Sequence, residues 1–462
     1  MSATSVVRPI PLANPPPEAN NGGVVPWSDD PVLDPQQGGF VMQHHAGCFT
    51  SARRSTSFVF ALVATFFLVA SLSYSAQSQT YTVIHNFTGG QDGGQPAAGP
   101  TLDASGNLYG TTFSGGNKSD CASGCGAVYK LTHHSSSWVL SPLYSFTGGG
   151  DGALPEYGAV TLGPDSAPYD TTSSGALDES GTIFNVRPRA TACPTTICPW
   201  TENTVHQFGT GNDGLQPLGS AIFDAAGNLY GTTYLGGASG MGTVFEATRS
   251  GQNWTESVIY NFAGSSDGAN PVAGLTFDSA GDLYGTTYSG GANGWGTVFK
   301  LSPSGSGWTK TVIYNFQNAN DGRAPTGGVI FDQVGNLYGG TVFGGVNSGG
   351  VVYELSPSGG NWTLTTLYSF SSVAGPYNTL TFDASGNLYG TTYRDGAELA
   401  GSVFKLTQSG GNWTFTDLHD FTDANDGGYP TSSVAVDAHG DVYGTASSGG
   451  SSGQGVVFEI TP

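Results

Sequence analysis

The chain is poor in charge, since only 10% of its 462 residues are Asp, Glu, Lys or Arg. Helices with salt-bridged solvent faces need more charged residues than this, whereas 73 glycines and 12% aromatic residues are typical of short strands joined by tight turns. Basic residues are scarcest: 13 Lys and Arg against 34 acidic residues give a net charge of −21. Because that charge repels phosphate backbones and anionic membrane surfaces, we expect no nucleic-acid partner.

Cysteine is also sparse, with five copies, one of which, Cys48, precedes the only long apolar run. The other four fall in two short loops, as the pairs Cys121/Cys125 and Cys193/Cys198. Neither pair has the spacing of a zinc ribbon, and the residue after Cys125 is Gly rather than the His of a haem attachment site, so we expect no metal or haem there. Four cysteines allow three pairings, and we expect one disulfide within each loop, in an oxidising compartment.

The long apolar run is uncharged from residue 57 to 76 and follows Arg53 and Arg54. A basic region, an apolar stretch and small residues in this order predict a secretory signal peptide. The run is also long enough to remain as a membrane anchor, and a buried core helix is a further alternative. Residues 1–56 are rich in Pro and Gly, and we expect them to be disordered. The protein is thus expected to be secreted, periplasmic or held at the cell surface, with membrane contact only through 57–76.

A repeat dominates the rest of the chain, where the string Asn-Leu-Tyr-Gly-Thr-Thr returns with small variations. Its tyrosines are Tyr109, Tyr230, Tyr284, Tyr338, Tyr389 and Tyr443, with a degenerate copy of the string around Tyr169. A phenylalanine that ends an alternating apolar run recurs equally often, at Phe87, Phe146, Phe208, Phe262, Phe316, Phe370 and Phe421. Both markers predict seven units.

One unit shows what each repeat builds. Residues 274–278, 283–288, 297–301 and 308–316 are rich in β-branched and aromatic residues and predict four antiparallel strands, a to d. Strict alternation would place Trp308, Val312, Tyr314 and Phe316 on one face of strand d. Four strands per unit, repeated seven times without helices, predict an all-β fold, a seven-bladed β-propeller over residues 81–462.

The two ends of the repeat array are complementary. Residues 81–87 align with strand d, whereas the chain stops at Pro462 just after a strand c. We therefore expect 81–87 to complete the last blade, which would close the ring and remove an exposed edge.

These repeats resemble the GloVer tandem repeat of exported bacterial proteins. The resemblance covers residues 81–462 and rests on Phe-Asp-x-x-Gly-Asn-Leu-Tyr-Gly-Thr-Thr, followed by Gly-Gly, Gly-Thr-Val-Phe, Trp and Tyr-Asn-Phe. It implies export, often with a surface anchor, but no activity. Since no C-terminal anchor follows Pro462 in this sequence, any attachment is expected to use 57–76.

Asp-Gly pairs recur in the loops that join strand d to the next strand a. The aspartates are Asp92, Asp151, Asp213, Asp267, Asp321 and Asp426, and the sixth loop lacks one. Asp-Gly is common turn chemistry. Alternatively, a ring of carboxylates at the channel mouth could bind sugar hydroxyls or Ca²⁺, although one Asp per loop is few ligands for calcium.

No catalytic motif stands out, and we assign no catalytic residue, no metal site and no cofactor other than the Ca²⁺ candidate above. His85, His206 and His419 occupy a strand d position that holds Tyr in other units, so they are expected to pack like Tyr. Glu156 and Asp178 depart from the repeat, and departures are where a site would lie.

The uniform units favour a monomeric, non-enzymatic recognition module for an extracellular glycan or protein, because an enzyme needs unlike residues at one place. An extracellular polysaccharide hydrolase or lyase and a structural cell-envelope protein are the alternatives.

Overall fold

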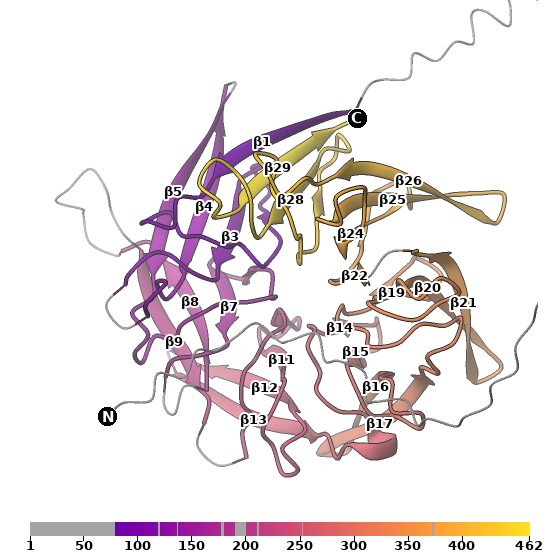
Figure 1. Cartoon of the computed structure of the whole chain (residues 1–462). Coiled ribbons are helices and arrows are strands. Elements are labelled where there is room, and N and C mark those ends of the chain that lie inside the picture. The colour runs from indigo at the N-terminus through magenta and orange to yellow at the C-terminus, as the bar shows by residue number, and fades with distance from the viewer. Residues whose placement is uncertain are drawn as a thin grey trace, which may run out of the picture. The chain divides into compact units, whose positions relative to one another are not determined.

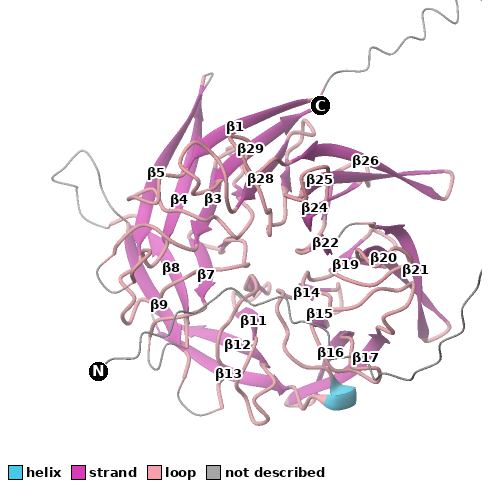
Figure 2. Ribbon diagram, viewed as in Figure 1, coloured by secondary structure: helices cyan, strands magenta, loops and turns pink. Residues whose placement is uncertain are grey.

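The computed structural model describes residues 79–462, apart from 119–120, 136, 177–179, 190–199, 210–211, 252 and 372–373. The N-terminal extension expected at 1–56 and the apolar segment at 57–76 lie outside the described residues. Within the described ranges no helix is long and apolar enough to cross a membrane. The regular structure there is β, interrupted by one 3₁₀ turn, η2 (Ser265–Asp267), which is cyan in Figure 2.

Seven antiparallel sheets stand in a ring, which confirms the predicted seven-bladed β-propeller (Figure 1). Blade 1 consists of β2 (Thr101–Leu102), β3 (Leu108–Thr112), β4 (Ala127–His134) and β5 (Ser137–Ser145). Blade 2 consists of β6 (Thr161–Leu162), β7 (Pro168–Thr172), β8 (Thr182–Arg187) and β9 (Thr201–Gln207). Blade 3 consists of β10 (Ile222–Phe223), β11 (Leu229–Thr233), β12 (Thr243–Ser250) and β13 (Asn253–Asn261). Blades 4 and 5 consist of β14 (Thr276–Phe277), β15 (Leu283–Thr287), β16 (Thr297–Ser304) and β17 (Gly307–Asn315), and of β18 (Ile330–Phe331), β19 (Leu337–Thr341), β20 (Val351–Ser358) and β21 (Asn361–Ser369). Blade 6 consists of β23 (Thr381–Phe382), β24 (Leu388–Arg394), β25 (Ser402–Ser409) and β26 (Asn412–Asp420), with the extra β22 (Ala374–Pro376) paired to β24.

Blade 7 is closed by the two ends of the described chain. Its sheet order is β1-β29-β28-β27, built from β1 (Thr80–Asn86), β27 (Ala435–Val436), β28 (Val442–Ala446) and β29 (Val456–Thr461). In Figure 1 the indigo β1 lies along the yellow β29. The register joins Thr80 to Thr461 and Asn86 to Val456. The predicted closure by the first strand is therefore confirmed.

The repeated residues form the cores between blades. All five residues of β15 are buried, and a Cβ added to its central Gly285 would come within 2.7 Å of the Phe299 ring. The glycine thus leaves room for an aromatic ring against the sheet. That ring joins a core cluster in which Tyr230 and Phe262 of blade 3 meet Leu283 of blade 4. Each blade therefore buries both faces against its neighbours.

The prediction that Trp308, Val312, Tyr314 and Phe316 share one face of strand d is wrong, because β17 contains a bulge. Its register with β16 skips one residue between the pairs Phe299/Val312 and Val298/Tyr314. An extra residue in one strand reverses which side chains face each side beyond it. Trp308 accordingly packs on Tyr230 of the preceding blade, whereas Phe316 packs on Tyr353 of the following blade.

Candidate functional site

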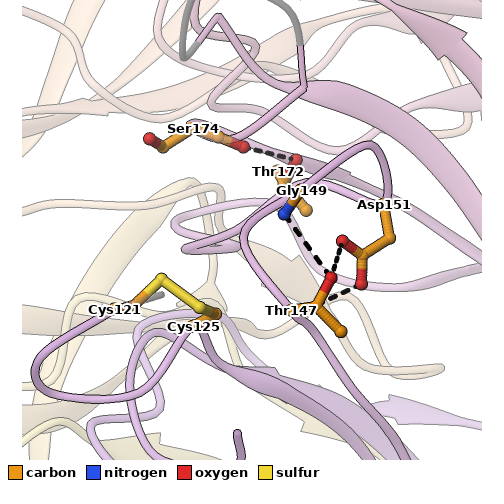
Figure 3. Close-up of a disulfide and its surroundings, with 7 residues drawn as sticks. All are labelled: Cys121, Cys125, Thr147, Gly149, Asp151, Thr172 and Ser174. Carbon is orange, nitrogen blue, oxygen red and sulfur yellow. Dashed lines mark hydrogen bonds between the residues drawn. A yellow bond between two sulfur atoms is a disulfide. The ribbon is translucent and has the colours of Figure 1, made fainter. Parts of the chain in front are cut away.

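The six Asp-Gly carboxylates lie beside the outer strands, each hydrogen-bonded within its own loop. Asp151 accepts hydrogen bonds from the backbone N–H and the hydroxyl of Thr147, at 2.8 and 2.6 Å (Figure 3). The glycine that follows, Gly152, has a φ of 87°, and its added Cβ would come within 2.1 Å of the Thr172 hydroxyl. The backbone conformation and the close approach both require Gly here. These contacts are those of a capped turn, and a ligand role for the six carboxylates stays a prediction.

Each of these carboxylates also bonds an aromatic side chain seven positions earlier, on strand d. The tyrosine hydroxyls of Tyr144, Tyr260 and Tyr314 donate to their Asp at 2.9, 2.7 and 3.0 Å. At the other three positions a histidine Nε2 lies 3.1 to 3.3 Å from the carboxylate, in the pairs His85–Asp92, His206–Asp213 and His419–Asp426. The histidines therefore take the place of Tyr, as predicted, but each has a carboxylate partner that was not predicted from the sequence. The constant spacing of seven residues was the signal that would have revealed it.

The residue before the proline of each Asp-Gly loop links two blades through its main chain. Leu154 has a φ of 57°, donates its N–H to Cys125 O of blade 1 at 2.9 Å, and accepts from Ser173 N of its own blade at 3.1 Å. The same left-handed conformation recurs at Gln95, Gln216, Asn270, Ala324 and Tyr429. A left-handed non-glycine residue is strained, and the repeated inter-blade bonds offset that cost.

The inner strands surround a narrow central channel. Small residues such as Gly219, Ser220 and Gly274 line a cavity of about 190 Å³ there. Asn378 of blade 6 reaches across it, because its Nδ2 donates to the carbonyl of Tyr157 in blade 2 at 3.2 Å and to that of Thr431 in blade 7 at 3.0 Å. A hydrogen bond between blades 2 and 6, which are not neighbours, shows that a single side chain bridges the channel at this level.

Four tyrosines form an aromatic arc on the mouth of this channel. Their ring centroids are 5.5 Å apart for Tyr157 and Tyr377, 5.6 Å for Tyr377 and Tyr393, and 5.6 Å for Tyr393 and Tyr429. Tyr157, Tyr393 and Tyr429 are half-buried, so each keeps part of its surface toward solvent. The Arg394 guanidinium lies 5.5 and 5.7 Å from the rings of Tyr393 and Tyr429, and its Nε is buried without a hydrogen-bond partner among the described residues. No sequence pattern predicts this arc, because it joins loops that are far apart along the chain.

Blade 2 departs from the repeat in two buried carboxyl groups. Glu156 follows the strained Leu154–Pro155 pair at the mouth, and burial raises its pKa to about 7, against a hydrogen bond with Ser173 that lowers it. Asp170 stands where other blades have the glycine of strand b. It is fully buried, neither carboxylate oxygen has a hydrogen-bond partner among the described residues, and burial holds its pKa well above the ordinary value. Asp178, the other predicted departure, lies outside the described residues.

The raised pKa of Glu156 predicts a pH-dependent stability. The unfolded side chain ionises near pH 4.5 and the folded one near pH 7, so the folded state binds more protons between these values and stability falls as the pH rises through that window. A shift of this size corresponds to about 3 kcal/mol. Glu156→Gln should therefore raise the free energy of unfolding at pH 8 by up to this amount and leave it unchanged at pH 4. Urea unfolding at both pH values measures the difference, and an equal effect at both would contradict the assignment.

One of the two predicted cysteine pairs can be located. The sulfur atoms of Cys121 and Cys125 are 2.09 Å apart in the b to c loop of blade 1, drawn as a disulfide in Figure 3. Cys193 and Cys198 lie outside the described residues. The oxidation state of both pairs stays a prediction.

Two groups of side chains among the described residues have the composition and spacing to hold a metal ion. They are His206, Asp213 and Glu256, and Asp437, His439 and Asp441. The second group lies in an exposed turn, where His439 is 85% exposed and Asp437 caps the backbone. The first lies between blades 2 and 3.

Solved structures with a similar fold differ widely in sequence. The extracellular domain of a one-component system from B. thetaiotaomicron is 9% identical with a TM-score of 0.50, over 82% of this chain and 40% of that chain. A protein assigned as a glucose dehydrogenase oxidoreductase from Thermus thermophilus is 16% identical (TM-score 0.42; 66% of this chain, 95% of that chain), and a gluconolactonase from Xanthomonas campestris is 12% identical (TM-score 0.39; 85% and 92%). The likeness to the first of these structures shows the fold alone.

No curated protein sequence matches the chain. A family model does, that of the Gloeobacter/Verrucomicrobia repeat, over residues 196–375 and 306–462. This match confirms the resemblance to the GloVer repeat that the sequence indicated. Because the matched residues make up more than half of the sequence, the chain belongs to the Gloeobacter/Verrucomicrobia repeat family.

Proposed function

We propose that the protein is an exported recognition module that binds a neutral carbohydrate at the mouth of its propeller without altering it chemically. The observation that carries the proposal is the aromatic arc, in which Tyr157, Tyr393 and Tyr429 keep exposed surface and the buried Tyr377 packs between Tyr157 and Tyr393. Ligand sites combine apolar and aromatic surface with a few polar groups. Aromatic rings stack on the apolar C–H faces of sugars, and the Arg394 guanidinium beside them can donate to sugar hydroxyls.

The charge of the protein narrows the class of ligand. A net charge of −21 disfavours acidic polysaccharides as well as nucleic acids, because like charges repel at long range. A neutral glycan has no such penalty. We also propose export through the apolar segment 57–76, either cleaved or kept as an anchor, with a monomeric propeller outside the cytoplasm. The paired sulfurs of Cys121 and Cys125 are in keeping with an oxidising compartment.

The test is a thermal-shift screen of the protein with neutral polysaccharides and oligosaccharides. A ligand at about a hundred times its dissociation constant should add close to 3 kcal/mol of stability. Tyr393→Ala and Tyr429→Ala should each weaken binding about fivefold to tenfold, since one stacked ring contributes about 1 kcal/mol, whereas Tyr393→Phe should bind like the wild type.

Asp267→Asn and Asp321→Asn serve as matched controls, because both lie in the outer loops. Unchanged binding in these variants would support the aromatic arc. If the Asp variants lost binding and the tyrosine variants kept it, the ligand would bind at the Asp-Gly loops instead. No shift with any glycan would overturn the proposal and favour protein recognition or a structural role.

One observation favours a polysaccharide hydrolase or lyase as the second candidate. The buried Glu156 adjoins Tyr157 of the aromatic arc, and burial raises its pKa to about 7, which suits a general acid at neutral pH. Release of oligosaccharides by the wild type, abolished in Glu156→Gln while binding is kept, would establish this activity over simple recognition.

A further inference from the structure

We propose that His206, Asp213 and Glu256 form a binding site for a divalent cation of the zinc type, between blades 2 and 3. His206 lies on β9, Asp213 in the loop that follows it, and Glu256 on β13 of the next blade. Their ligand atoms all lie within 4.8 Å of one another. The site is separate from the channel mouth and independent of the proposed carbohydrate binding.

The distances suit a small cation. His206 Nε2 is 3.1 Å from Asp213 Oδ2 and 3.9 Å from Glu256 Oε2. With metal–ligand bonds of about 2.0–2.1 Å, two ligand atoms of a tetrahedral zinc site lie about 3.3 Å apart. Three protein ligands would leave a fourth position for water.

The hydrogen bond between His206 and Asp213 does not account for the buried position of Glu256 beside them. It is only 7% exposed, and its Oε1 is buried without a hydrogen-bond partner among the described residues. Its Oε2 is too far from His206 for a hydrogen bond. A buried carboxylate oxygen without a partner is costly, and a metal ion bound by this carboxylate would supply the missing interaction.

The equivalent positions in other blades show that this arrangement is specific to blades 2 and 3. In the next interface the place of Glu256 is taken by Lys310, which bonds Asp267 at 2.9 Å. In the preceding interface it is taken by Glu202, which accepts a hydrogen bond from Thr204 at 2.9 Å and faces Tyr144 rather than His. Beside the His85–Asp92 pair the aligned residue is Leu140. Only at blades 2 and 3, among the described interfaces, do His, Asp and Glu meet.

Asp213 also makes a longer hydrogen bond to the backbone of its turn than the equivalent Asp of the other loops makes. The first backbone N–H of the loop, that of Gly209, is 3.4 Å from Asp213 Oδ1. In the other five loops the equivalent bond to Asp is 2.8 to 3.0 Å. One imidazole and two carboxylates match the ligand preferences of Zn²⁺ and Co²⁺ better than those of Ca²⁺, which prefers oxygen alone.

The test is a titration of the chelator-treated full-length protein with Co²⁺, whose visible absorption reports tetrahedral coordination, followed by displacement with Zn²⁺. We expect a site that His206→Tyr and Glu256→Gln each weaken at least about tenfold. Tyr is the residue at this position in four other blades, so the first variant should fold. His85→Tyr and Glu202→Gln are the matched controls and should bind as the wild type does.

Three results would overturn the proposal. The wild type could bind neither ion, the controls could lose as much affinity as the site variants, or Ca²⁺ could displace Co²⁺ more effectively than Zn²⁺. Melting curves of each variant without metal separate a loss of folding from a loss of ligands.

Discussion

Deletion of residues 80–87 should abolish the cooperative melting transition of the protein and cause it to aggregate. The deletion removes β1 and leaves β29 as an open edge with unpaired backbone groups. It also removes Phe87, which is fully buried against Tyr129 of blade 1, and Tyr81, which stacks on His419 of blade 6. Loss of one buried Phe costs about 3–5 kcal/mol, which approaches the whole stability of a typical domain.

Melting curves and size-exclusion chromatography measure this effect, and a synthetic peptide of residues 79–88 provides the control. Added in excess, the peptide should pair with β29 and restore both the monomer and the transition. A deletion variant that melts like the full chain would contradict the closed ring. A variant that the peptide does not rescue would show that the strand matters during folding rather than for closure.

Gly219→Ala should destabilise the propeller by about 3 kcal/mol or more, the upper range for an overpacked core. An added Cβ at Gly219 would lie 2.3 Å from the carbonyl carbon of Ala273 and 2.4 Å from the nitrogen of Gly274. These atoms belong to the backbone of the next blade at the channel, so they cannot move without displacing that blade.

Gly307→Ala is the matched control, since nothing lies within 4 Å of its added Cβ and its φ is not positive. This variant should stay within about 0.5 kcal/mol of the wild type or be slightly more stable, because Ala lowers the entropy of the unfolded chain. Urea unfolding of both variants gives the comparison. Similar stabilities would mean that the inner strands can spread apart and that the channel is not tightly packed.

The sequence was sufficient to predict the fold because the same four-strand pattern recurs seven times. The Tyr and Phe markers predicted the number of blades, and the offset between 81–87 and Pro462 predicted the closure that β1 and β29 form. Strand limits were less accurate. Residues 274–278 were predicted as strand a, yet β14 covers only Thr276–Phe277, because the preceding residues line the channel instead of pairing along the sheet.

The candidate site could not be predicted in the same way. Tyr157 and Tyr377 meet across the mouth from blades 2 and 6, and no local pattern records that contact. The bulge in β17 was likewise missed, although Val312, Ile313 and Tyr314 are three apolar residues in a row and break the alternation where the register shifts. Glu156 was noticed as a departure from the repeat, but its burial, and therefore its pKa, depends on neighbours that only the ring brings together.

The left-handed residues before the loop prolines are positions where the side chain can vary without a change in the propeller scaffold. Each of them donates its main-chain N–H to a carbonyl of the preceding blade, so this link between blades does not depend on which side chain stands there. The six positions indeed hold Gln, Leu, Gln, Asn, Ala and Tyr. Substitution at these points can therefore alter the chemistry of the mouth while the scaffold keeps its dimensions, much as hypervariable loops are displayed on a constant framework.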